Sequence, residues 1–293
     1  MTRICLVYNP AAGAYRADRL AALVAALERE GFAVTTSPTR RPGGPDCADA
    51  DIVCVNGGDG TLRDTVQELG ARAGEVPLCV APLGTINLVA RELGYHRDPG
   101  RFARALREAW VGGAERRVRA PLYALGDAPV VSCLSIGPDS HAVAQVSPAL
   151  KKRIGRYAYA VALMRQLGRW ERRAMAITGE LADGTAFACR AEAAIVTHGA
   201  FYAGSFRLSA QSALAADAVE LVAIPRATRT ATALLIAAAL LRLPVARLGL
   251  AEIRSCRRID FGAGAGPVQV DGDHVPQGGH VVAPTGLTLT YLV

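Results

Sequence analysis

The chain has 293 residues, of which 51% are hydrophobic and 20% are charged, and its formal net charge is +7. This length suffices for two modest domains with packed cores. The longest uncharged apolar stretch, residues 230–241, is too short for a membrane span, which needs roughly 20 residues. It predicts a buried or interfacial helix instead. The N-terminus lacks the apolar core of a signal peptide, which favours a cytosolic protein.

The first part of the chain alternates between strand and helix patterns. Apolar runs predict strands at 3–8, 32–36, 51–55 and 78–81, and helical spacing predicts helices at 15–30, 62–69 and 101–110. This rhythm is typical of a parallel sheet with helices on both faces. Ligands of such sheets bind outside the carboxyl ends of the strands. We therefore expect an α/β domain over residues 1–118.

The pattern changes after residue 119, where strands dominate. The predicted strands are 129–136, 173–180, 186–197, 219–224, 255–261, 268–270, 280–283 and 287–292, and the predicted helices are 148–170 and 229–243. Turn sequences separate the strands, among them the glycine-rich segment 262–267. We expect residues 119–293 to form a β-rich, antiparallel, sandwich-like domain.

The cysteines and histidines point to neither a disulfide framework nor a metal site. Seven scattered cysteines never form a Cys-x-x-Cys arrangement, and several lie in apolar runs, where a thiol acts as a small hydrophobe. The five histidines show no pair with metal-ligand spacing. His198 is interpreted as a polar substitution in a loop.

The most informative segment is Gly57-Gly58-Asp59-Gly60-Thr61, between a predicted strand and a predicted helix. Glycines at a strand exit let backbone N–H groups approach an anion, and the helix start adds its positive dipole end. Polar loops at 9–13 and 82–87 follow two other strands and can converge on the same site. The Walker and Rossmann glycine patterns are absent, so the motif predicts a phosphate site of another kind.

Three segments together resemble the signatures of the diacylglycerol kinase catalytic domain, in its bacterial lipid kinase branch related to sphingosine and ceramide kinases. They are Asn9-Pro10 with Gly13, the Gly57–Thr61 motif, and Pro82-Leu83-Gly84-Thr85-Ile86-Asn87-Leu88-Val89-Ala90-Arg91. NAD kinases and 6-phosphofructokinases share the second motif but lack the third. The resemblance continues through residues 135–140, 151–159 and 270–273, and so covers essentially the whole chain.

The resemblance implies phosphoryl transfer from ATP, with Mg²⁺, to a lipid hydroxyl. The implied nucleotide contacts are Asn9, Thr39, Gly57, Gly58, Asp59, Gly60, Thr61, Leu62, Arg63, Thr85 and Asn87. Asp59 would orient the metal or the phosphates. Asp273 takes the position of the family's proton-accepting glutamate, with Asp139 as its partner. A carboxylate near the attacking hydroxyl suits phosphoryl transfer.

Several positions depart from the family pattern. Asp273 is one methylene shorter than the usual glutamate, Asp64 also replaces a glutamate, and residues 198–205 replace an asparagine and a glycine run. The segment 216–218 replaces an Asp-Asp-Gly whose second acid anchors a structural magnesium, and that acid survives as Asp217. The implied metal ligands are Asp217 and positions Glu220 and Val222. We expect an active kinase.

Charge distribution indicates the partners. Eight basic residues and one acid, Glu171, lie between Lys151 and Arg173. This segment is either a solvated helix face or a surface for anionic lipid headgroups, and it lacks features of a nucleic-acid site. We therefore expect a cytoplasmic protein peripherally associated with the inner face of the membrane. A homodimer is left open.

The sequence leaves two alternatives to a kinase for diacylglycerol, a sphingoid base or ceramide. The first is a soluble-metabolite kinase resembling NAD kinase, which would lack an apolar cleft in its second domain. The second is a non-catalytic lipid- or nucleotide-binding regulator, suggested by the aspartates that replace glutamates. The apolar helix near 231–241 favours the lipid kinase, because such an enzyme must house acyl chains, although an ordinary core helix would show the same pattern.

Overall fold

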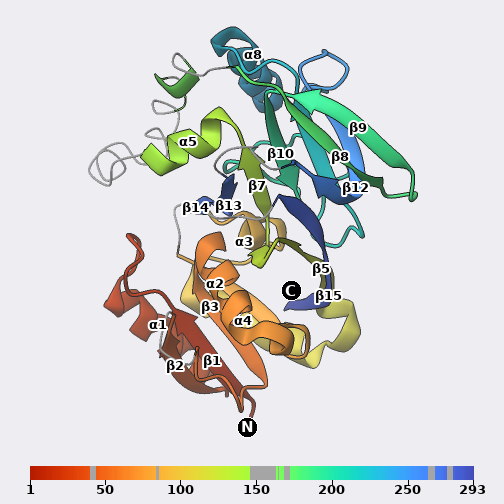
Figure 1. The fold of residues 1–293 in the computed structure, drawn as a ribbon. Coiled ribbons are helices and arrows are strands. Elements are labelled where there is room, and N and C mark those ends of the chain that lie inside the picture. The colour runs from red at the N-terminus through yellow and green to blue at the C-terminus, as the bar shows by residue number, and fades with distance from the viewer. Residues whose placement is uncertain are drawn as a thin grey trace. The chain divides into compact units, whose positions relative to one another are not determined.

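The chain folds into two compact units in a computed structural model (Figure 1). One unit comprises Met1–Leu122 and Gly286–Val293, and the other comprises Tyr123–Thr285. The last residues thus return to the first unit, whereas the sequence analysis places them in the second domain. The structure describes residues 1–39, 44–83, 86–145, 163, 165–167, 172–262, 268–275 and 280–293.

The first unit is built on parallel strands in the order β2-β1-β3-β4-β15. Its strands are β1 Arg3–Tyr8, β2 Ala33–Pro38, β3 Ile52–Gly57, β4 Leu78–Pro82 and the end of β15 Val281–Leu292. Its helices are α1 Ala17–Arg29, α2 Asp59–Leu69, α3 Leu88–Glu92 and α4 Pro99–Val111, with 3-10 turns at Gly70–Gly74 and Gly113–Arg116. The predicted α/β architecture is confirmed.

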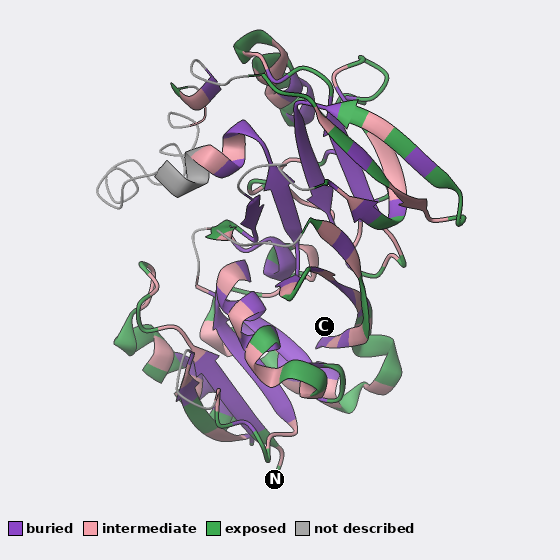
Figure 2. Ribbon diagram, in the orientation of Figure 1, coloured by how far each residue is buried: buried purple, intermediate pink, exposed green. Residues whose placement is uncertain are grey.

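Apolar alternation explains how the helices cover this sheet. Ile52 and Cys54 of β3 pack with α1 and α4 in one buried cluster, so both helices cover the same face. Val53 and Val55 point to the opposite face, since successive side chains of a strand alternate. All four side chains are fully buried (Figure 2). The strand is therefore held from both sides, and its carboxyl end is fixed where the glycine motif begins.

The second unit is an antiparallel sheet in the order β14-β13-β7-β10-β11-β12. Its elements are the end of β5 Arg117–Leu125, which begins in the first unit, and β6 Ala128–Val130, β7 Cys133–Ile136, α5 Pro138–Gln145, β8 Met175–Leu181, β9 Ala186–Ala191, β10 Ala193–Thr197, β11 Val219–Ile224, α8 Arg229–Leu240, β12 Glu252–Asp260, β13 Val268–Val270 and β14 Asp273–Val275. The hairpin β8–β9 pairs with β12, and the start of β15 does too. The predicted β-rich unit is confirmed.

Both faces of this antiparallel sheet are apolar. One face packs against the hairpin β8–β9 in one buried cluster, and the other face packs against α8 and residues 202–208 in a second cluster. Strand β10 shows the division, because Ala194 and Val196 belong to the first cluster and Ala193 and Ile195 to the second. This two-sided burial explains why the strand reads as a continuous apolar run rather than an alternating one.

Some predicted elements differ in the structure. The strand predicted at 186–197 is two strands, because Glu192 interrupts it and its carboxylate accepts the backbone N–H of Ala227 at 2.8 Å. The strand predicted at 129–136 is also divided, and the two C-terminal strands are one, β15. Most of the predicted helix 148–170, most of the basic segment 151–173 and most of the turn 262–267 lie outside the described residues, although 163 and 165–167 are described and helical.

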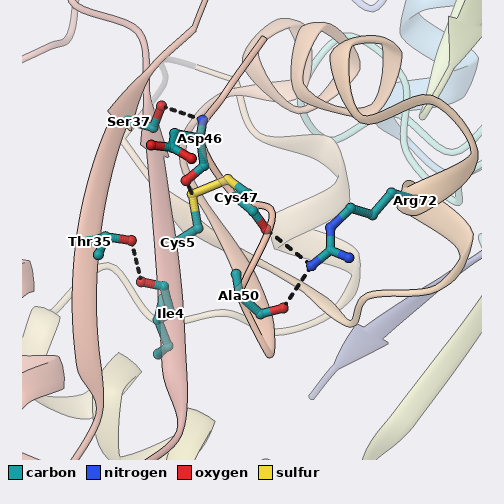
Figure 3. The surroundings of a disulfide bond; sticks show 8 residues. All are labelled: Ile4, Cys5, Thr35, Ser37, Asp46, Cys47, Ala50 and Arg72. Atoms are coloured by element: carbon teal, nitrogen blue, oxygen red, sulfur yellow. Dashed lines mark hydrogen bonds between the residues drawn. A yellow bond between two sulfur atoms is a disulfide. The ribbon is translucent and has the colours of Figure 1, made fainter. Parts of the chain in front are cut away.

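A disulfide joins Cys5 on β1 to Cys47, with Cα atoms 5.4 Å apart (Figure 3). The expectation of no disulfide is therefore wrong. Arg72 holds the Cys47 loop from the other side, donating to the carbonyls of Cys47 and Ala50 at 3.1 and 3.0 Å. Spacing could not show the bond, because the two cysteines are 42 residues apart and meet only when the chain returns beside β1.

We expect Cys47→Ala to lower the free energy of unfolding by about 3–4 kcal/mol under non-reducing conditions, because the bond closes a long loop in the unfolded chain. Urea unfolding with and without dithiothreitol measures this effect. The wild type with reductant should match the variant, and Cys189→Ser, at a half-buried free thiol, should unfold like the oxidised wild type. Equal stability of the wild type with and without reductant would contradict the assignment.

Candidate active site

The glycine motif forms the first turn of a helix. Strand β3 ends at Gly57, Gly58 is the N-cap, and α2 begins at Asp59, three residues earlier than the sequence predicts. Among the described residues, no side chain caps the N-terminus of α2. The first N–H groups of a helix lack partners within the helix, and they attract anions together with the helix dipole. The motif is therefore built to receive phosphate.

Gly57 is required by close packing within this turn. A Cβ atom at Gly57 would lie 2.5 Å from Oγ1 and 2.6 Å from Cβ of Thr61. Thr61 itself is buried, and its carbonyl accepts the hydroxyl of Thr65 at 2.8 Å. The threonine thus folds back over the glycine, which keeps the turn tight at the exit of the strand.

Asp59 ties the glycine motif to the third signature segment, residues 82–91. Its carboxylate accepts the backbone N–H groups of Leu88 at 2.8 Å and of Val89 at 3.0 Å, at the start of α3. Burial raises the pKa of Asp59 to about 6, against the opposing effect of the two N–H donors. Both oxygens are engaged, so this carboxylate fixes the geometry of the two segments.

Two buried polar side chains at the carboxyl ends of β2 and β3 have no hydrogen-bond partner among the described residues. They are Thr39, through its hydroxyl, and Asn56, through both amide atoms. Asn56 is in register with Tyr8 on β1, and the N–H of Thr39 donates to the carbonyl of Tyr8 at 2.8 Å. Unsatisfied buried polar groups are costly, so both fit a site that is completed by a polar ligand.

The sequence analysis did not assign Asn56 to the site. Its signal is a polar residue at the end of a buried apolar run, immediately before the glycine motif. An amide offers a donor and an acceptor at once, which suits a heterocyclic base or a ribose hydroxyl as well as a phosphate.

The remaining nucleotide contacts implied by the resemblance lie in this unit. Asn9 shapes its own loop, since Oδ1 accepts the N–H of Ala11 at 2.9 Å. Arg63 forms a buried ion pair with Asp64 at 2.9 Å, and Leu62 is fully buried. Asn87 is the N-cap residue of α3, and Thr85 lies outside the described residues.

Asp271 anchors the turn that carries Asp273. Its φ of +51° and the +88° of Gly272 suit a two-residue hairpin turn, which links β13 to β14. The buried carboxylate accepts the N–H groups of Val131, Ser132 and Cys133 at 2.9–3.0 Å. Asp273 follows as the exposed first residue of β14. The first acid of the motif is thus structural, and the second is presented to solvent.

Asp139 lies on α5, which contacts β13 and β14, so it and Asp273 belong to neighbouring elements of the second unit (Figure 1). The carboxylate of Asp139 accepts the hydroxyl of Tyr202 at 2.6 Å. The pKa of His141 is lowered by burial and by His274, whereas Asp139 acts in the opposite direction. Tyr202, His141 and His274 were missed by the sequence analysis, because they come from three distant segments.

His198 lies in the loop after β10, as the sequence predicts, and its side chain is buried. It is 2% exposed, and burial lowers its pKa to about 4, so the ring is neutral near pH 7. Its ring packs against Tyr123 with centroids 5.5 Å apart.

The three metal-ligand positions do not form a cluster of acidic side chains. Asp217 is exposed and its carbonyl accepts the Tyr123 hydroxyl at 2.7 Å, whereas buried Glu220 accepts the Ser209 hydroxyl at 3.0 Å. Val222 lies within β11. Across the part of the chain that the structure describes, no three His, Cys, Asp or Glu side chains are grouped to hold a metal. A structural magnesium remains a prediction.

Comparison with known proteins finds a family match within the first unit. Residues 3–115 match the model of the diacylglycerol kinase catalytic domain. A Pseudomonas putida protein named "probable lipid kinase YegS-like" is 35% identical over 107 residues, 36% of this chain and 34% of the relative. The chain thus spans about a third of the length of the curated relatives it matches. The expected resemblance is confirmed.

Solved structures extend the likeness of the fold to the whole chain. A diacylglycerol kinase from Bacillus anthracis superimposes with a TM-score of 0.69 and 18% identity, covering 99% of this chain and 96% of that one. An NAD kinase from Archaeoglobus fulgidus, solved with ATP, gives a TM-score of 0.53 and 15% identity, covering 100% and 94%. No helix among the described residues is long and apolar enough to cross a bilayer.

Asp59 should leave a signature in the pH dependence of stability. Its pKa lies near 6 in the folded state and at 3.8 ordinarily, so the folded state retains a proton that the unfolded chain loses between these values. The contribution of Asp59 to the free energy of unfolding therefore falls by up to about 3 kcal/mol as pH rises from 4 to 6 and is constant at higher pH.

Urea unfolding of the wild type and Asp59→Asn between pH 4 and 7 measures this contribution. The difference in stability between the two should shrink as pH rises through this window, since asparagine does not titrate. Exposed Asp49→Asn is the control. A difference independent of pH would show that Asp59 titrates normally.

Proposed function

We propose that the protein is an ATP- and Mg²⁺-dependent lipid kinase that phosphorylates a hydroxyl of diacylglycerol, a sphingoid base or ceramide. The observation that carries the proposal is the Asp59 link, which joins the second and third family signatures into what would be one phosphate-binding wall. The matched domain supports the kinase class, and the whole-chain likeness to a diacylglycerol kinase fold supports its extension to the second unit.

The first unit would bind the nucleotide. The uncapped N–H groups at the start of α2 would hold phosphate oxygens. Thr39 and Asn56 would supply hydrogen bonds at the neighbouring strand ends, and their unpartnered buried atoms fit that role. Bound Mg²⁺ would neutralise the phosphate charge that develops during transfer.

The second unit would present the acceptor. The Asp273 carboxylate would take the proton of the lipid hydroxyl as its oxygen bonds to the γ-phosphorus and the bond to the ADP oxygen breaks. The Asp139 carboxylate, which accepts the Tyr202 hydroxyl, would add negative charge near Asp273. The turn anchored by Asp271 keeps Asp273 exposed, as a group that meets an incoming substrate must be.

The proposed location is the cytoplasmic face of the membrane, where the lipid acceptor is found. A glutathione-buffered cytosol would keep Cys5 and Cys47 reduced. The location thus implies that the dithiol form predominates in the cell.

Radiolabelled ATP offered with diacylglycerol, monoacylglycerol, sphingosine, ceramide and phosphatidylglycerol tests the function, with NAD as a soluble arm. We expect label in at least one lipid and none in NADP. Label in NADP alone would support the soluble-metabolite kinase. Binding of ATP without transfer to any acceptor would support a non-catalytic regulator.

Asp273→Asn should lower the rate of transfer by about 100-fold or more, because an amide cannot accept the proton. The KM for ATP should remain unchanged. Asp273→Glu should retain activity, and Asp183→Asn, in an exposed turn of the same unit, serves as the control. Full activity of Asp273→Asn would remove this residue from the mechanism.

Asn56→Ala should raise the KM for ATP about tenfold, because a buried amide loses its ligand hydrogen bonds. The kcat should change little if the contact persists through the reaction. Ser132→Ala is a matched control, since Ser132 is also buried with an unpartnered hydroxyl but lies in the second unit. An unchanged KM in Asn56→Ala would exclude Asn56 from the nucleotide site.

A further inference from the structure

The outward side of α8 is apolar. Thr230, Ala233, Leu234, Ala237, Leu240 and Leu241 are all exposed, and their helical spacing places them on one face (Figure 2). Leu234, Leu240 and Leu241 are 59%, 61% and 70% exposed. A surface helix normally turns charged and polar residues outward, so this face is unusual for a helix that meets water.

The inward side of the same helix is anchored in the core. Leu235, Ala238 and Ala239 are buried in the cluster that covers one face of the second unit's sheet. The hydroxyl of Thr228 caps the helix by accepting the N–H of Ala231 at 3.1 Å. The exposed leucines are therefore displayed by a fixed element, and their exposure does not come from a frayed end.

The turns after α8 extend the same surface. Leu243 donates its N–H to the carbonyl of Ala238 at 2.8 Å, which closes the helix as in a Schellman motif. A second turn follows, in which Val245 is buried and Leu248 is 53% exposed. Five exposed leucines, Leu234, Leu240, Leu241, Leu243 and Leu248, form what we term the α8 leucine surface. They are five of the seven exposed large hydrophobic residues in the described parts of the chain.

The charged residues of the chain segment that carries this surface have one sign. Arg226, Arg229, Arg242 and Arg247 are exposed, and no Asp or Glu occurs between Glu220 and Glu252. In the described structure none of the four arginines forms an ion pair. Arg242 has a φ of +56°, a conformation in which glycine would be less strained. A guanidinium thus occupies the end of the helix at the rim of the leucines.

These features favour an anionic lipid surface over a second copy of the chain as the partner. A second copy of the chain would bring like arginines together across a self-complementary interface, with no acid to pair them. An anionic lipid surface matches both parts, since leucines enter the acyl boundary while arginines remain at the phosphates. At 12 residues the helix is about 18 Å long, short of the roughly 30 Å hydrocarbon core, so it would lie in the interface.

We propose that the α8 leucine surface, with its four arginines, is a docking surface for anionic phospholipid bilayers. The inference adds a point of contact to the membrane association included in the proposed function. It is tested without ATP or substrate, so its failure and the failure of the kinase proposal are separate results.

Sedimentation with vesicles of phosphatidylcholine, alone or mixed with phosphatidylglycerol, tests the proposal. We expect the wild type to bind the mixed vesicles and Leu241→Asp to bind them about tenfold or more weakly. Val111→Asp is the matched control, because Val111 is 69% exposed, as Leu241 is, but lies in the first unit. It should bind like the wild type. Leu248→Asp replaces Leu241→Asp if the latter does not fold.

The charge requirement has its own variant. Replacing Arg242 and Arg247 together by glutamine should weaken binding to the mixed vesicles about tenfold and leave the weak binding to phosphatidylcholine unchanged. Equal binding by Leu241→Asp and Val111→Asp would overturn the proposal. A dimeric wild type that Leu241→Asp converts to a monomer, in sedimentation velocity without vesicles, would also overturn it and assign the surface to self-association.

Discussion

The structure of the candidate site depends on one carboxylate. The Asp59 side chain projects from the first turn of α2, and its carboxylate accepts two backbone N–H groups at the start of α3, 29 and 30 residues later. An apolar side chain at this place would strand both donors, and an asparagine could satisfy only part of them. Because of this link, two segments that are separate motifs in the sequence lie side by side, and we propose that they bind phosphate together. The raised pKa of Asp59 shows that burial disfavours the charged form of this carboxyl group.

The second unit uses the same device at another motif. Asp271 accepts three consecutive N–H groups from a segment about 140 residues earlier, and this fixes the short hairpin that carries Asp273. Motif acids in this chain therefore divide into two kinds. Asp59 and Asp271 are buried and bound to backbone, whereas Asp139 and Asp273 lie on neighbouring elements of the second unit, where we propose that they act on the substrate hydroxyl. Sequence motifs do not distinguish these kinds, because buried Asp271 and exposed Asp273 both adjoin Gly272.

Local patterns predict much of the fold. The apolar run at β3, the glycine turn after it and the change to β-rich structure are all legible in the sequence, since each is set by neighbouring residues. The Cys5–Cys47 bond cannot be predicted from local patterns, because the two thiols meet only through the path that the chain takes after β2. The same holds for Asn56, whose unpartnered amide appears only when its neighbours are known, and for α8. The composition of α8 predicts a buried or interfacial helix, but only the structure separates the buried Leu235 from the exposed Leu241.

The central claim is that the Asp59-linked segments form the phosphate site. Hydrogen exchange of the backbone amides at 58–61 and 88–89, with and without ATP, tests it most directly. We expect the backbone amides of Leu88 and Val89 to exchange slowly in the wild type without ligand. The amides at 58–61 should exchange more slowly when ATP binds. In Asp59→Asn, Leu88 and Val89 should exchange faster and the effect of ATP should weaken. Unchanged exchange at 58–61 under saturating ATP would contradict the account.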